Sequence, residues 1–159
     1  MSGLPPFTAA SAISAGRERP AGYHDAFAAR GLTPDPMLVM DGQWAEIRGY
    51  ERMRELLSLD NPPTAVFCAN YNMTLGALAY LHEAGIEIPR DLSLVSFDDV
   101  PALRLHNPAV TAVVQPIAEV AEAIARIVDA RLADPSAMGR HEQRIDCGIT
   151  LRDSTRRLK

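Results

Sequence analysis

The chain has 159 residues, 47% hydrophobic and 23% charged, which is typical of a globular domain and unlike a disordered protein. Sixteen Lys and Arg against 20 Asp and Glu give a formal net charge of −4, which argues against a dedicated nucleic-acid-binding surface. The sequence contains no apolar run of the ~20 residues that a membrane span needs, and its start does not resemble a secretory signal. We therefore expect a cytoplasmic protein in which Cys68 and Cys147 are reduced core thiols.

The first half of the sequence predicts a loop at residues 1–16, followed by alternating helices and strands. Apolar residues at helical spacing predict helices over 17–30 and 47–57, and short apolar runs predict strands at 37–40 and 64–69. Pro20 restricts the start of the first helix, because a proline deep inside a helix clashes with the carbonyl four residues earlier. This helix should therefore begin near Glu18 or Arg19.

The second half continues the alternation. It predicts helices over 75–81 and 117–132, strands at 92–97 and 111–114, and a last strand over 144–151. Strands that alternate with helices of this length form βαβ units. We therefore predict an α/β fold with a parallel sheet and helices on both faces.

Signatures of common enzymes and cofactor sites do not occur in the sequence. It contains no G-x-G-x-x-G, G-x-x-x-x-G-K-[ST], G-x-S-x-G or H-E-x-x-H. Its four histidines lack the spacing of helical metal ligands. We expect no enzymatic activity and no cofactor or metal, although an enzyme of an unrecognised type is not excluded by these patterns.

Polar and aromatic residues follow the predicted strands, where ligands bind in open parallel sheets. Asn70, Asp98 and Trp44 follow three successive strands, and Arg19 lies near the start of the first helix. Carboxylates, amides and an indole face suit a neutral polyhydroxylated ligand such as a sugar. Each residue also has a structural alternative: helix capping for Asn70 and Asp98, packing for Trp44, and solvent exposure for Arg19.

Five segments follow one family's pattern in order. Residues 67–77 (FCANYNMTLGA) resemble F-x-A-N-D-x-M-A-L-G-A, and residues 88–99 (IPRDLSLVSFDD) resemble V-P-x-D-[IV]-S-V-V-G-F-D-D. Residues 17–23 (RERPAGY), 108–116 (PAVTAVVQP) and 151–155 (LRDST) are similar to R-x-R-L-x-G-Y, P-P-L-T-T-V-x-Q-P and [VL]-x-R-x-S-T. Over almost its whole length the chain thus resembles the effector-binding region of the lactose-repressor (LacI) family of bacterial transcriptional regulators.

The resemblance implies a type I periplasmic-binding-protein-like fold, in which two α/β subdomains enclose an effector cleft. Residues 1–110 would form most of the C-terminal subdomain, 111–144 a crossover strand and helix of the N-terminal subdomain, and 145–159 a return strand and tail. The helix-turn-helix headpiece and most of the N-terminal subdomain have no counterpart, so we expect an incomplete fold and DNA contact only through a headpiece that the chain lacks. The unpaired sheet edge predicts self-association or strand exchange if the chain folds alone.

The resemblance also implies roles for single residues. Effector contacts would come from Arg19, Asn70 and Asp98, with Trp44 lining the pocket, and dimer contacts from Leu75, Leu78 and His106. Three positions depart from the family pattern, namely Tyr71 in place of Asp, Ser96 in place of Gly and Pro20 in place of Leu.

The sequence therefore predicts the effector-sensing and dimerising part of a LacI-type regulator with a small sugar-like effector. In the intact regulator, the effector would bias the orientation of the two subdomains. The alternative is a periplasmic-type solute-binding protein of a transporter, which shares the fold.

Overall fold

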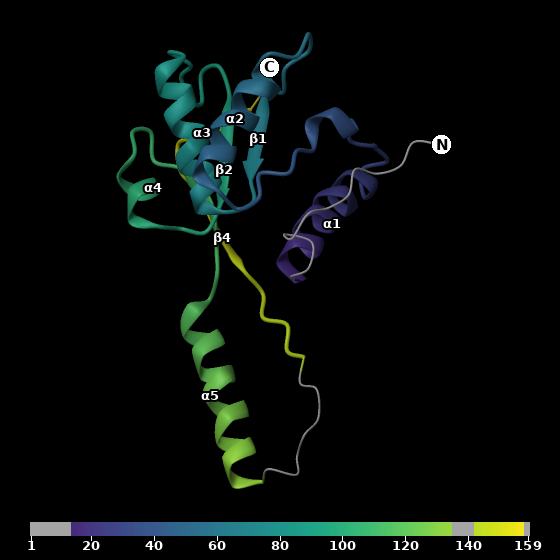
Figure 1. Cartoon of the computed structure of the whole chain (residues 1–159), viewed down its shortest axis with the longest axis vertical. Coiled ribbons are helices and arrows are strands. Elements are labelled where there is room, and N and C mark those ends of the chain that lie inside the picture. Colours follow the sequence, from purple (N-terminus) through teal and green to yellow (C-terminus); the bar gives the residue numbers. More distant parts are fainter. Residues whose placement is uncertain (1–13, 135–141, 158–159) are drawn as a thin grey trace.

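The computed structural model describes residues 14–134 and 142–157. Its helices are α1 (Ser14–Ala28), the 3₁₀ helix η2 (Pro36–Leu38), α2 (Glu46–Leu57), α3 (Tyr71–Glu83), α4 (Pro101–Leu105) and α5 (Ile117–Ala133). Its strands are β1 (Ala65–Cys68), β2 (Ser93–Phe97), β3 (Thr111–Val114) and β4 (Gly148–Thr150). Their order along the chain is that of the predicted α/β fold (Figure 1).

The strands form one sheet in the order β1-β2-β3-β4. The strands β1, β2 and β3 are parallel, with Val66 opposite Leu94 and Ser96 opposite Ala112. The return strand β4 runs antiparallel to β3, with Ile149 opposite Val113. The parallel part of the sheet carries the carboxyl-end edge at which the sequence places the candidate site.

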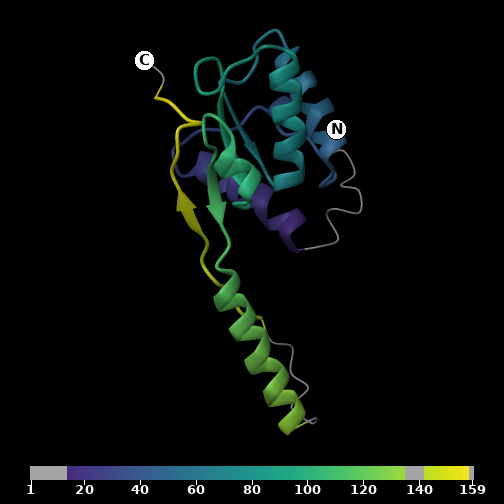
Figure 2. The same cartoon turned by 90° about the vertical axis from the view of Figure 1, so that its left-hand side faces the viewer.

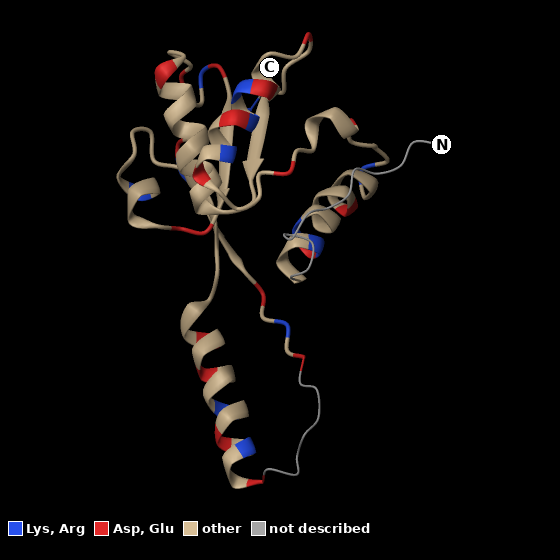
Figure 3. Cartoon of the chain, in the orientation of Figure 1, with Lys and Arg blue, Asp and Glu red and all other residues tan. Residues whose placement is uncertain are grey.

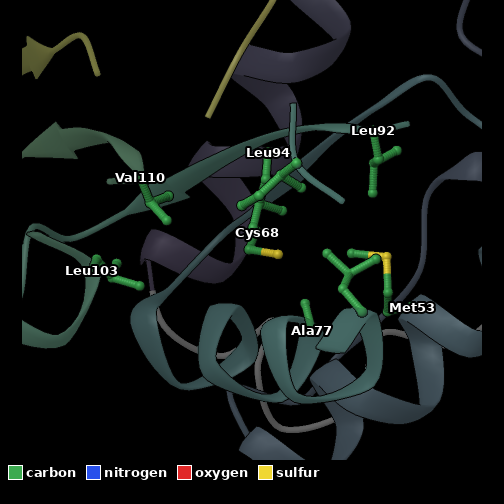
Figure 4. Packing of buried hydrophobic residues seen from close by; sticks show 9 residues of the cluster. Met53, Cys68, Ala77, Leu92, Leu94, Leu103 and Val110 are labelled. Carbon is green, nitrogen blue, oxygen red and sulfur yellow. The ribbon is translucent and has the colours of Figure 1, made fainter. Parts of the chain in front are cut away.

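The hydrophobic core lies between the sheet and the paired helices α2 and α3. Figure 4 shows Cys68 and Leu94 of the strands directed toward Ala77 of α3 and Met53 of α2. The cluster of buried side chains consists of Met53, Cys68, Ala77, Leu81, Ile88, Leu92, Leu94, Leu103 and Val110. Two glycines let the helices approach closely: a Cβ on Gly49 would lie 2.2 Å from the carbonyl oxygen of Met73, and one on Gly76 would lie 1.9 Å from that of Glu46.

Helices contribute to both faces of the sheet. Ser96 of β2 faces α3, because its hydroxyl lies 2.7 Å from that of Thr74. Successive side chains of a strand point to opposite faces, so Phe97 faces away from α3. Arg19 of α1 lies over the ring of Phe97, which places α1 on the second face. The predicted layering is confirmed.

Helix α5 projects away from this body on the two strands β3 and β4 (Figures 1 and 2). Among its 17 residues only Ala123 is buried, and both acidic and basic residues occur along the helix (Figure 3). The large exposed aliphatic side chains of this helix are Ile117, Ile124, Val128 and Leu132. The apolar stripe that predicts the helix is therefore present but uncovered within the described part of the chain.

Within the described residues, the edge of the sheet at β1 is unpaired as well. Ala65 and Phe67 of β1 are exposed. A cavity of about 90 Å³ is lined by the four consecutive residues 66–69 together with Met40, Met53 and Met73. Because consecutive residues point to opposite faces, a cavity that touches all four runs along the strand edge. This edge agrees with the expected unpaired strand, and self-association stays a prediction.

Two predicted elements in the first half are wrong. Helix α1 begins at Ser14, well before Pro20, and so includes residues expected in a loop. A proline inside a helix crowds the carbonyl four residues earlier, here that of Gly16, and leaves it without its helical hydrogen bond, yet α1 continues through Pro20 to Ala28. The strand expected at 37–40 is replaced by η2, whose first turn Asp35 caps by accepting a hydrogen bond from the Met37 N–H at 2.9 Å. Val39 is extended, but no described strand pairs with it.

One of the two cysteines and the last strand also differ from expectation. Cys147 is exposed and is not a core thiol, whereas Cys68 is buried and its pKa rises to about 12 because burial disfavours the thiolate. The last strand has three residues instead of the eight predicted. Residues 1–13 of the expected N-terminal loop lie outside the described residues. No described helix is long and apolar enough to cross a membrane.

Candidate functional site

Arg19 is the centre of the candidate site. Its guanidinium carbon lies 3.5 Å from the ring centroid of Phe97 and 5.1 Å from that of Trp44, and its Nη1 donates to the carbonyl oxygen of Ala69. Burial lowers the pKa of Arg19, and the nearby carboxylate of Asp98 opposes that shift. The guanidinium thus lies over two aromatic rings at the carboxyl ends of β1 and β2, and it is not the solvent-facing residue of the structural alternative.

Asn70 connects the end of β1 to the turn that carries Trp44. Its Oδ1 accepts a hydrogen bond from the Met73 N–H at 3.0 Å, which caps α3. Its Nδ2 donates to the carbonyl oxygen of Trp44 at 3.1 Å. The capping role considered from the sequence is therefore confirmed, and the second bond fixes the Trp44 turn beside α3.

Asp98 follows β2 and bonds to the segment that leads into α5. Its N–H donates to the carbonyl oxygen of Val113 at 3.0 Å, and its Oδ1 accepts a hydrogen bond from Nε2 of Gln115 at 2.5 Å. Helix α4 has Val100 at its N-cap without a side-chain bond, so Asp98 does not cap it. Asp98 is therefore not a helix cap, and its Oδ2 makes no hydrogen bond within the described residues.

The backbone around the site adopts conformations that L side chains rarely take. The φ angles are 48° at Gln43, 59° at Trp44 and 77° at Asp98. Such left-handed residues cost free energy and concentrate at ligand-binding turns. The indole Nε1 of Trp44 is buried and has no hydrogen-bond partner in the described part of the chain. An unpaired buried donor is costly, so it suits a site that gains an acceptor on binding.

The four residues selected from the sequence, Arg19, Trp44, Asn70 and Asp98, thus gather at one edge of the sheet. Their contact with a ligand stays a prediction. Two neighbours, Phe97 and Gln115, were not selected from the sequence, although both lie in the motifs. Gln115 comes directly after the strand at 111–114, so the rule that draws attention to strand ends points to it as well.

Substitutions at Asn70 can separate its two structural roles, which are the cap of α3 and the hydrogen bond to the Trp44 carbonyl. We expect Asn70→Ala to lower the free energy of unfolding by about 1 kcal/mol, because α3 loses its N-cap. Asn70→Asp keeps the capping oxygen but loses the donor to the Trp44 carbonyl, so we expect near wild-type stability with altered Trp44 fluorescence. Urea unfolding and the emission of Trp44, the single tryptophan of the chain, measure the two effects. Unchanged emission in Asn70→Asp contradicts the second role.

Asp99, the neighbour of Asp98, holds the tail of the chain. Arg152 donates from Nη1 and Nη2 to the two carboxylate oxygens of Asp99, both at 2.8 Å, and from Nη1 to the carbonyl oxygen of Val110 at 2.7 Å. Both side chains are largely buried, with exposed fractions of 15% and 10%. The hydrogen bonds from Arg152 hold the pKa of Asp99 below its ordinary value. The bidentate pair fixes the chain just after β4 against the end of β2, and the bond to Val110 holds it against the start of β3.

We expect Arg152→Ala to lower the free energy of unfolding by about 2–3 kcal/mol, because it leaves a largely buried carboxylate without its main partner. Since the pKa of Asp99 is depressed in the folded state, its contribution is present above the ordinary pKa and is lost as the pH falls through the lowered folded pKa. Wild-type stability should therefore fall more steeply than that of Arg152→Ala below about pH 4. Urea midpoints across this range measure the difference, and parallel curves contradict the assignment.

Comparison with known proteins agrees with this geometry. A family model described as "Periplasmic binding protein-like domain" matches residues 7–155. The transcriptional repressor CytR of Escherichia coli (strain K12) is 34% identical over 138 residues, which are 86% of this chain and 40% of the repressor. The chain therefore spans about two fifths of the length of that relative.

Two solved structures extend the similarity to the fold. A transcriptional regulator CelR–cellobiose complex has a TM-score of 0.79 and 31% identity, covering 87% of this chain and 42% of that one. A LacI-family regulator from Enterococcus faecium with bound ribose has a TM-score of 0.78 and 29% identity, covering 90% of this chain and 52% of that one. The chain therefore belongs to the family of periplasmic binding protein-like domains, in the form that LacI-family transcriptional regulators carry.

Proposed function

We propose that the chain is the effector-sensing and dimerising part of a cytoplasmic LacI-type transcriptional regulator, and that it binds a small sugar-like ligand. The observation that carries the proposal is the placement of Arg19 over the rings of Phe97 and Trp44, beside the carboxylate of Asp98. The cellobiose and ribose in two similar structures support a sugar as the ligand class.

In this proposal each residue has a distinct task. Arg19 donates to ligand hydroxyls, and Asp98 accepts from them through the carboxylate oxygen that Gln115 does not occupy. The indole of Trp44 covers the apolar face of the sugar ring, and its unpartnered N–H gains an acceptor. Asn70 holds the Trp44 turn and presents its remaining amide hydrogen to the ligand.

We infer that the cleft lies between two subdomains, to which the chain contributes unequally. Residues 1–110 belong to one subdomain, 111–144 to the other, and 145–159 return to the first. The exposed aliphatic side chains of α5, on an element that projects from the body, support this division (Figure 2). Such a stripe is typical of a helix that packs against another layer of an α/β subdomain.

The dimer contacts in this proposal come from α3 and the turn that follows α4. Leu75 and Leu78 are only partly buried, although both pack against the core. His106 is also partly buried, and its Nδ1 lies 2.8 Å from the carbonyl oxygen of Pro108. Because these side chains are partly exposed, a second protomer can pack against them while α3 and the turn after α4 stay folded.

Sugar binding can be tested by titrating the chain with D-ribose and with cellobiose while the emission of Trp44 is recorded. Because Trp44 lies in the site, a bound ring should change its emission in a saturable way. L-Ribose serves as the control for D-ribose, since it has the same composition as D-ribose but the opposite handedness. A sugar effector predicts saturation with one of the two sugars and none with L-ribose. No saturable response, or an equal response to L-ribose, contradicts the proposal.

A further inference from the structure

Two hydroxyl groups are completely buried beneath the candidate site. Thr74 lies in the first turns of α3 and Ser96 in β2, both with an exposed fraction of 0%, and their oxygens are 2.7 Å apart. Thr74 Oγ1 lies 2.9 Å from the carbonyl oxygen of Asn70. Ser96 Oγ lies 3.0 Å from the carbonyl oxygen of Phe97 and 3.4 Å from that of Asp98. The hydroxyl pair therefore bridges the two turns that carry Asn70 and Asp98.

The number of protons limits how this bridge can be bonded. Each hydroxyl has one proton to donate, and the bond between the hydroxyls uses one of the two. The remaining proton bonds either the carbonyl of Asn70 or that of Phe97. In a buried, low-dielectric environment the two arrangements differ in how firmly each turn is held. A change at one turn is thereby transmitted to the other across the sheet–helix boundary.

We propose that Thr74 and Ser96 are positioning residues of the ligand site, and that their hydroxyl pair couples the Asn70 turn to the Asp98 turn. The part of this proposal that concerns ligand binding rests on the function proposed above. Ser96 stands where the family pattern has glycine, so the coupling uses a hydroxyl that the pattern lacks.

The coupling can be tested in the ligand-free chain by amide hydrogen exchange. The Met73 N–H reports on the Asn70 turn because it is bonded to Asn70 Oδ1, and the Asp98 N–H reports on the other turn through its bond to Val113. We expect Ser96→Ala to slow exchange at Met73, and Thr74→Val to slow exchange at Asp98, because the remaining hydroxyl then donates only to the carbonyl of its own turn. Each change should be about fivefold, as for one hydrogen bond gained by that turn.

Thr74→Ser is the matched control, because it keeps the hydroxyl and should leave exchange at Asp98 within about twofold of wild type. Amides of α2 serve as the reference for global opening. The proposal is overturned if each substitution accelerates exchange only in its own turn. It is also overturned if exchange at the α2 amides changes in the same direction and to the same extent, since the substitutions then act through overall stability.

Ligand binding provides an independent second readout. If D-ribose or cellobiose binds the wild-type chain, Thr74→Val should weaken binding by about tenfold, while Thr74→Ser should stay within about twofold. Equal affinity of both variants and the wild type overturns the positioning role. If neither sugar binds, the sugar-sensing function fails, whereas the exchange experiment still decides the coupling.

Discussion

Asp98→Ala is expected to lower the affinity for the sugar that binds the chain by more than about 100-fold, because the ligand loses its charged acceptor. One carboxylate oxygen of Asp98 accepts a hydrogen bond from Gln115, and the other accepts none from the described residues. Hydrogen bonds to a charged oxygen are about twice as strong as neutral ones. Titration calorimetry, with the sugar identified by Trp44 fluorescence, measures the loss.

Asp98→Asn is the matched control for this prediction. Asparagine accepts a hydrogen bond from Gln115 and tolerates the φ of 77° at this position, which alanine adopts at a cost of about 1 kcal/mol. We expect Asp98→Asn to fold with wild-type stability and to lose about tenfold in affinity, since only the charge is removed. Wild-type affinity in both Asp98→Ala and Asn70→Ala would falsify the site.

Gly76→Ala is expected to lower the free energy of unfolding by about 3 kcal/mol or more, because the new methyl group has no space. A Cβ at Gly76 would lie 1.9 Å from the carbonyl oxygen of Glu46 and 2.7 Å from the nitrogen of Tyr50, both backbone atoms of α2. Backbone of a packed helix cannot rotate away as a side chain can, so α2 and α3 must separate. Urea unfolding and near-ultraviolet circular dichroism detect the loss of packing.

Gly22→Ala provides the control. Gly22 lies inside α1, and a Cβ there would have no atom within 4 Å. Alanine favours a helix interior over glycine by up to about 1 kcal/mol, so this substitution should leave stability unchanged or raise it. If Gly76→Ala unfolds at the same urea concentration as Gly22→Ala, the close contact between α2 and α3 is wrong.

The helices and strands that depend on local pattern could be predicted from the sequence. The apolar spacing at 47–57 and 117–132 matches α2 and α5 almost to the residue, and the runs at 64–69 and 92–97 contain β1 and β2. Periodicity reports which face of an element is apolar, and this is a local property. It does not report whether that face is covered, which explains how α5 was predicted correctly although its stripe is exposed.

The errors occurred where structure depends on distant partners. The segment 37–40 has the composition of a strand, but a strand needs a paired neighbour, and here a capped turn at Asp35 takes its place. For the site, strand ends point to Asn70 and Asp98, whereas they point to Trp44 only through the strand expected at 37–40, which the structure does not contain. The stacking of Arg19 on two rings, the left-handed backbone at Trp44 and the bond from Gln115 to Asp98 depend on three-dimensional geometry that spacing does not encode.

Helix α5 is joined to the body through the two strands β3 and β4, so a small rotation of these strands moves the far end of the helix by a larger distance. Seventeen residues at 1.5 Å each make a rod of about 25 Å. Gln115, just before this rod, bonds to Asp98, and Arg152, just after β4, bonds to Asp99. A rotation of about 10° at the β3–β4 ribbon displaces the far end of the rod by about 4 Å. A rearrangement of one or two hydrogen bonds at the base of this lever is thus amplified into a movement as large as the width of a side chain.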